Sequence, residues 1–111
     1  MSKYYNVKTT IDDLAIANKI TKTLLEKMLV SSVQRREVSS TWWWNHELEE
    51  ATEYVLEMKT KKELYPRIEQ EIKKLHSYEV PEIFVEEIKE APKEYLNWIE
   101  KETALGQNKF I

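Results

Sequence analysis

The chain has 111 residues, of which 41% are hydrophobic and 33% charged, with one Gly, three Pro and no Cys. This length and composition predict a single domain over residues 1–111, with an ordered core over about residues 4–102 and a tail over 104–111. The lack of Cys excludes cysteine nucleophiles, Cys-ligated zinc and disulfide bonds.

Charge and hydropathy exclude two further classes of partner. The net charge is −3 and the two signs are interspersed, so no broad positive surface is expected to attract nucleic acid. The sequence has no apolar run of about 18 residues and starts without the apolar stretch of a secretory signal. We therefore expect a cytoplasmic protein without a nucleic-acid or membrane partner.

The first segment, residues 4–11, is rich in β-branched and aromatic side chains and predicts a strand. Asp12 and Asp13 then supply an N-cap and a first-turn acid. Apolar residues recur at helical spacing after them and predict a helix over residues 12–29. Its buried stripe is Ala17, Ile20, Leu24 and Met28.

Residues 31–60 have the pattern of a long β-hairpin. In the second arm, Tyr54, Leu56 and Met58 alternate with polar residues and predict one apolar face. Asn45-His46 is the expected turn, because Asn and His are among the non-Gly residues that best tolerate a positive φ.

The rest of the chain predicts a helix, a strand and a closing helix. Thr60 to Glu63 has capping-box spacing, but Pro66 favours a regular helix that begins nearer Tyr65 and ends near His76. Residues 80–88 are apolar on both faces, which predicts a strand covered on two sides. Pro92 suits the first position of a third helix, whose buried stripe is Tyr95, Leu96 and Ile99.

This order of elements is that of an α+β, ferredoxin-like βαββαβ sandwich with a long hairpin and a C-terminal helix. Two helices would cover one face of a four-stranded antiparallel sheet and leave the other face bare. Alternation places Trp42 and Trp44 on one side of the hairpin and Trp43 on the other. We expect these three residues to form a subunit interface, because interface cores favour large aromatic side chains.

Candidate site residues are few. His76, at the end of the second helix, could bind a metal, although a lone His there more often caps the last carbonyls. Glu47, Glu49 and Glu53 share a face, but residues two apart on a strand are separated by about 7 Å, so a solvated acidic edge is expected. Glu79 and Glu82 flank Pro81, and nothing in the sequence indicates a raised pKa for either. No phosphate-binding Gly loop or activated nucleophile is present, so we expect no enzyme activity.

Several short motifs occur in order along residues 4–102. They are Thr9-Thr10 before an acidic cap, Glu26-Lys27-Met28, Ser40-Thr41-Trp42-Trp43-Trp44 leading into Glu47-Leu48-Glu49, Lys59-Thr60, His76-Ser77-Tyr78-Glu79-Val80-Pro81-Glu82-Ile83 and Tyr95-Leu96-Asn97-Trp98-Ile99. In this order they resemble the CutA family of divalent-cation tolerance proteins.

The resemblance implies a tight homotrimer, similar in architecture to the PII signalling proteins, and a link to tolerance of copper and other divalent ions. It also implies clefts between subunits that gather Lys59, Tyr78, Glu79 and Trp98 around a small ligand. Metal ligation in some members uses a Cys and two His; here those positions hold Lys8, Leu75 and His76. Any Cu²⁺ or other divalent cation would therefore be weakly held. The alternative is a structural or signalling trimer that binds no metal.

Overall fold

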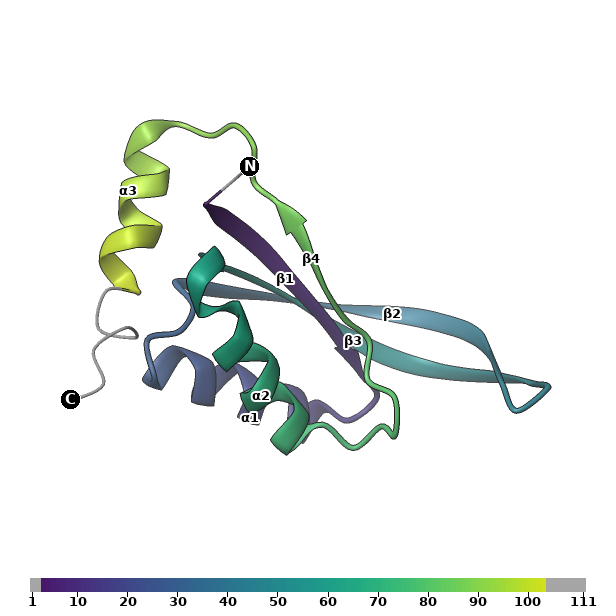
Figure 1. Cartoon of the computed structure of the whole chain (residues 1–111). Coiled ribbons are helices and arrows are strands. Elements are labelled where there is room, and N and C mark those ends of the chain that lie inside the picture. The colour runs from purple at the N-terminus through teal and green to yellow at the C-terminus, as the bar shows by residue number, and fades with distance from the viewer. Residues whose placement is uncertain (1–2, 104–111) are drawn as a thin grey trace.

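The computed structural model describes residues 3–103, so the predicted tail lies outside the described residues. The described part has three α-helices, one short 3-10 helix and one four-stranded sheet (Figure 1). The elements are β1 (Tyr4–Ile11), α1 (Leu14–Glu26), β2 (Ser32–Trp44), β3 (Glu47–Lys61), η1 (Lys62–Leu64), α2 (Tyr65–Leu75), β4 (Ile83–Glu87) and α3 (Lys93–Glu102).

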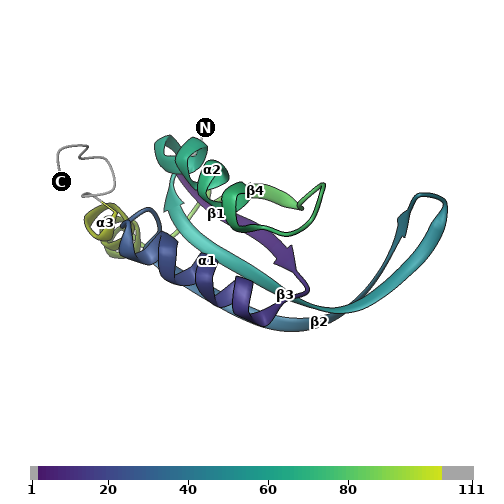
Figure 2. The same ribbon diagram turned by 90° about the horizontal axis from the view of Figure 1, so that it is seen from below.

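The sheet has the strand order β2-β3-β1-β4, and every neighbouring pair is antiparallel. Helices α1 and α2 pack together on one face, and β1 and β3 provide the centre of the core beneath them (Figures 1 and 2). The α+β fold with a split βαβ connection is thus confirmed. The buried core is dominated by Val7, Ile11, Ile20, Leu24, Leu56, Met58, Ile68 and Ile72.

Helix α1 has the expected N-cap at Asp13, but it begins at Leu14, two residues later than predicted, and ends earlier than predicted. The Asp13 carboxylate accepts a hydrogen bond from the Ile16 amide at 3.1 Å and caps the helix. The predicted end at residue 29 is wrong, because Met28 has a φ of 55° and cannot continue a right-handed helix. Leu29 is then buried in the core, where Met28 had been expected.

The hairpin of β2 and β3 turns at Asn45 and His46, with φ values of 50° and 67°, so the predicted turn is confirmed. The last residue of β1 that pairs with β3 is Ile11, opposite Tyr54. Residues 38–44 and 47–53 therefore form a two-stranded ribbon, in which Trp43 lies opposite Leu48. This ribbon projects from the body of the molecule (Figures 1 and 2).

Two expectations for the later elements need correction, and the expected cover on both sides of β4, which could come in part from partner chains, is met on one side within this chain. Strand β4 is shorter than residues 80–88, and Val80 lies in the preceding loop, 66% exposed. Ile83 and Val85 pack against the core, but Phe84, on the opposite face, is 42% exposed, so only one side of β4 is covered within this chain. Pro92 is the N-cap residue, one position before the first turn of α3.

The second face of the sheet is not bare. Helix α3 lies at the end opposite the hairpin tip (Figures 1 and 2), where Glu100 accepts hydrogen bonds from Lys61 at 2.9 Å and Tyr4 at 3.1 Å. The middle of this face is polar, because Asn6 donates to Glu57 at 3.0 Å and Lys8 pairs with Glu86 at 3.3 Å. Exposed apolar surface is instead prominent on the ribbon, at Trp43, Trp44 and Leu48.

Candidate binding groove

His76 joins the end of α2 to the end of β1. Its Nε2 lies 2.8 Å from the Thr10 carbonyl oxygen, and its Nδ1 accepts a hydrogen bond from the Tyr78 amide at 3.2 Å. Because Nδ1 accepts, the proton of the neutral ring is on Nε2, which donates to Thr10. Burial lowers the pKa of His76 and outweighs the opposite effect of the Thr10 carbonyl. Both ring nitrogens are thus used within the chain, and the ring caps a strand rather than its own helix.

Tyr78 continues this connection to the hairpin. Its ring packs edge-on against His76, with a centroid distance of 4.8 Å, and its hydroxyl donates to Glu53 at 2.5 Å. Burial, and then the bond to the Glu53 carboxylate, raise the pKa of the Tyr78 phenol. Glu53 itself is only 6% exposed. The loop after α2 is therefore attached to the base of the ribbon.

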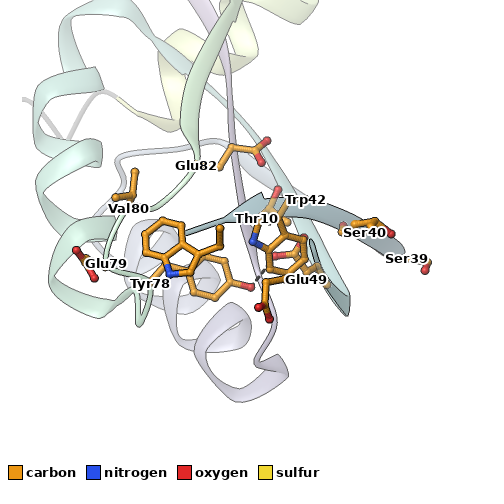
Figure 3. Close-up of a pocket in the computed structure, with 12 residues that line it drawn as sticks. Thr10, Ser39, Ser40, Trp42, Glu49, Tyr78, Glu79, Val80 and Glu82 are labelled. Carbon is orange, nitrogen blue, oxygen red and sulfur yellow. Dashed lines mark hydrogen bonds between the residues drawn. The ribbon is translucent and has the colours of Figure 1, made fainter. Parts of the chain in front are cut away.

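A groove of about 890 Å³ lies between this loop and the ribbon (Figure 3). Its walls include the aromatic side chains Trp42, Trp44 and Tyr78. Its carboxylates are Glu49, Glu53, Glu79 and Glu82, and its hydroxyl groups come from Thr10, Ser39, Ser40 and Thr41. The lining residues include no Lys or Arg among those that the structure describes, so the groove is electronegative.

The structure brings together some of the predicted site residues and separates others. Tyr78 and Glu79 line the groove, but Lys59 donates to Gln34 at 3.4 Å on the sheet, and Trp98 stacks on Tyr95 within α3. Neither Lys59 nor Trp98 is among the groove residues.

The positions equivalent to the metal ligands of the family do not form a ligand set. The Lys8 ammonium pairs with Glu86 and lies 5.8 Å from the centre of the Phe84 ring, and Leu75 packs against the core. Within residues 3–103, no group of three or more His, Cys, Asp or Glu side chains is arranged to hold a metal ion. His76 as a metal ligand stays a prediction.

Sequence reasoning missed the contribution of Thr10. The expected solvated acidic edge is correct for Glu47 and Glu49, which are exposed, and wrong for Glu53, which is 6% exposed. Glu53 and Tyr78 are far apart in the sequence and belong to different elements, so no local pattern joins them. One signal for the groove was available: Glu53 lies on the same face of the hairpin as Trp42 and Trp44, beside the end of β1.

In the part of the chain that the structure describes, no helix has the length and apolar character needed to span a membrane. The cytoplasmic location stays a prediction. One structure similar to this chain, that of the protein from Archaeoglobus fulgidus, is described as a periplasmic divalent cation tolerance protein, CutA.

Comparisons with known proteins agree with one another. The divalent-cation tolerance protein CutA of Pyrococcus horikoshii is 35% identical over 97 residues, which are 87% of this chain and 95% of that protein. The A. fulgidus structure has a TM-score of 0.87 at 34% identity and covers 90% of this chain and 98% of its own. CutA1 from Shewanella sp. SIB1, described as a stable protein from a psychrotrophic bacterium, has a TM-score of 0.88 at 31% identity, over 92% and 96% of the two chains.

The family model described as CutA1 divalent ion tolerance protein matches residues 5–102. Except for Tyr4, the first residue of β1, this span includes all the strands and helices that the structure describes and all the residues that line the groove. The chain therefore belongs to the CutA1 divalent ion tolerance protein family.

Proposed function

We propose that this protein acts in divalent-cation tolerance as a non-catalytic homotrimer that binds a small cation weakly in its groove. The names of its relatives refer to divalent cations, and Cu²⁺ is the one that the resemblance to the family implies. The observation that carries the proposal is the set of four glutamates around one groove whose described lining residues include no basic side chain. Such a site attracts cations and repels anions.

The ribbon supports assembly into a trimer. Trp43 is 70% exposed and Leu48, directly opposite, is 60% exposed, which leaves a projecting apolar pair in contact with water. Contiguous exposed apolar side chains of this kind mark association surfaces. Light scattering tests this part of the proposal: a closed trimer of the 13.4 kDa chain has a mass of about 40 kDa. A folded monomer at micromolar concentration would contradict it.

Titration tests the cation-binding part. Cu²⁺, Zn²⁺ and Cd²⁺ are added to the protein while tryptophan fluorescence and heat are recorded, since Trp42 and Trp44 line the groove. Binding at tens of micromolar, weakened by Glu49→Gln, supports the proposal. Glu50→Gln is the matched control, because Glu50 is the next residue on β3 and does not line the groove. If neither the heat nor the fluorescence changes with any of the three metals, the proposal that the groove binds a divalent metal ion is wrong.

A second candidate function is a scaffold that binds no ligand. It is favoured by the contacts of His76 and Tyr78, whose polar atoms are already used to hold strand, loop and ribbon together. Replacing His76 with Ala separates the two candidates. A large loss of thermal stability with unchanged ligand titrations supports the scaffold, whereas a selective loss of binding supports the site.

A further inference from the structure

The groove contains a buried carboxyl group that forms no ion pair with a Lys or Arg of the described chain. Glu53 is 6% exposed and lines the groove, where its carboxylate accepts a hydrogen bond from the Tyr78 hydroxyl. Within residues 3–103, Glu53 takes part in none of the ion pairs. A buried carboxylate is costly unless a positive charge or further hydrogen bonds compensate it. This side chain therefore favours a cation from outside the chain.

The residues around Glu53 strengthen this preference for a cation and indicate which chemical class of cation would bind. Glu49 and Glu82 face the same space as the ring of Tyr78 and the indole of Trp42 (Figure 3). Carboxylates attract any cation, and the faces of aromatic rings additionally attract ammonium and guanidinium groups. The rings also offer apolar surface for methylene groups.

The spacing of the carboxylates would hold a bare metal ion only weakly and favours a more extended cation as the tighter ligand. Hard divalent ions take about six or more oxygen ligands at about 2.0–2.6 Å, which requires donor atoms gathered around one point. Within the described residues, no three His, Cys, Asp or Glu side chains are gathered in this way. A groove of about 890 Å³ is instead within the range of sites that hold small organic molecules.

We propose that the groove binds an aliphatic organic cation with two or more separated ammonium or guanidinium groups, such as a polyamine. Its charged groups pair with Glu53 and Glu49, and its methylene groups lie against Trp42 and Tyr78. This inference rests on the proposed function only in placing a cation in the groove, and it names the chemical class of that cation.

The experiment is a titration of the full-length protein with spermidine, in which binding is measured by calorimetry and by tryptophan fluorescence. Saturable binding is expected, and Glu49→Gln is expected to weaken it by about tenfold, because one charge-assisted contact is lost. Glu50→Gln is expected to bind as the unchanged protein does. Trp42→Leu is expected to weaken binding severalfold, and light scattering on the same sample checks that the variant still assembles, since Trp42 also belongs to the expected subunit interface. The uncharged chain 1,8-octanediol should not bind.

Two results would overturn the inference: no saturable binding of spermidine, or equal weakening by Glu49→Gln and Glu50→Gln. Parallel titrations with Cu²⁺ and Zn²⁺ separate this failure from that of the proposed function. If the metals bind in a manner that depends on Glu49 and spermidine does not bind, the inference fails and cation binding by the groove stands. If neither spermidine nor the metals bind, both fail.

Discussion

Strand β3 passes through two regions that share one alternating pattern and have different surroundings. From Tyr54 to Lys59 it pairs with both β1 and β2, and Leu56, on the face beneath the helices, is fully buried. Nearer the tip it pairs with β2 as a ribbon, and Leu48, on the same face, is 60% exposed. The alternation decides which face a side chain takes, but burial requires that another element cover that face.

The largest expected difference between the two regions is in stability. Leu56→Ala should lower the free energy of unfolding by about 2–5 kcal/mol, because it leaves a cavity among fully buried neighbours. Leu48→Ala, the same substitution on the same strand and face, should lower it by less, because Leu48 is 60% exposed within its own subunit and can lose only contacts across the proposed trimer interface. Urea unfolding at one fixed protein concentration measures both, since assembly makes stability depend on concentration. Equal losses for the two variants would contradict the comparison.

The ribbon should instead control assembly. Trp43→Ala is expected to shift the mass distribution from trimer toward monomer, because an exposed indole at an interface commonly contributes about 2 kcal/mol or more. Light scattering over a dilution series measures the shift. Trp98→Ala is the control, since Trp98 is also exposed but lies on α3, at the opposite end of the molecule from the hairpin tip. If Trp98→Ala shifted the mass more than Trp43→Ala, the interface would lie elsewhere.

The junction between the two regions depends on the bond from Tyr78 to Glu53. Tyr78→Phe should lower stability by about 1–3 kcal/mol, because the buried carboxylate loses its donor. Tyr95→Phe is a matched control, since the Tyr95 ring stacks on Trp98 and, within residues 3–103, its hydroxyl takes part in no hydrogen bond. Urea unfolding measures both variants. A Tyr78→Phe protein as stable as the control would show that the bond contributes nothing.

The smallest expected effect is a dependence of stability on pH through His76. Because burial lowers the folded-state pKa of this imidazole, the unfolded chain binds a proton more readily. The contribution of His76 is complete above its ordinary pKa of 6.5 and is lost as the pH falls through the lower folded-state value. His76→Gln should remove that part of the slope, which urea midpoints between about pH 4.5 and 7.5 would measure.

The carboxylate of Glu71 also makes stability depend on pH, but at a lower pH than His76 does, so the two contributions can be told apart. The Lys27 hydrogen bond lowers the pKa of Glu71 below 4.5, so the stability that this pair adds is lost only as the pH falls further. If His76→Gln and the unchanged protein had parallel profiles down to pH 4.5, the assignment of the slope to His76 would be wrong.

Side-chain chemistry over short distances was enough to predict much of the fold. The Asp13 cap, the Asn45-His46 turn and the start of α2 near Pro66 were predicted correctly because neighbouring residues determine each of them. The predicted end of α1 was wrong because Met28 adopts a left-handed φ so that Leu29 can enter the core. Whether Met28 or Leu29 is buried depends on packing against other elements, and the spacing of apolar residues along one helix does not reveal that packing.

The candidate site depended far more on contacts between distant elements. Local patterns identified His76 and the alternation of the tryptophans. The order of motifs indicated the family that the comparisons establish, and that resemblance added Tyr78 and Glu79. Only the folded chain joins Thr10, Glu53 and Tyr78, which come from β1, β3 and the loop before β4. Hydrogen bonds between residues so far apart in the sequence form only after the register of the sheet is fixed. A local sequence pattern therefore cannot predict that these residues meet.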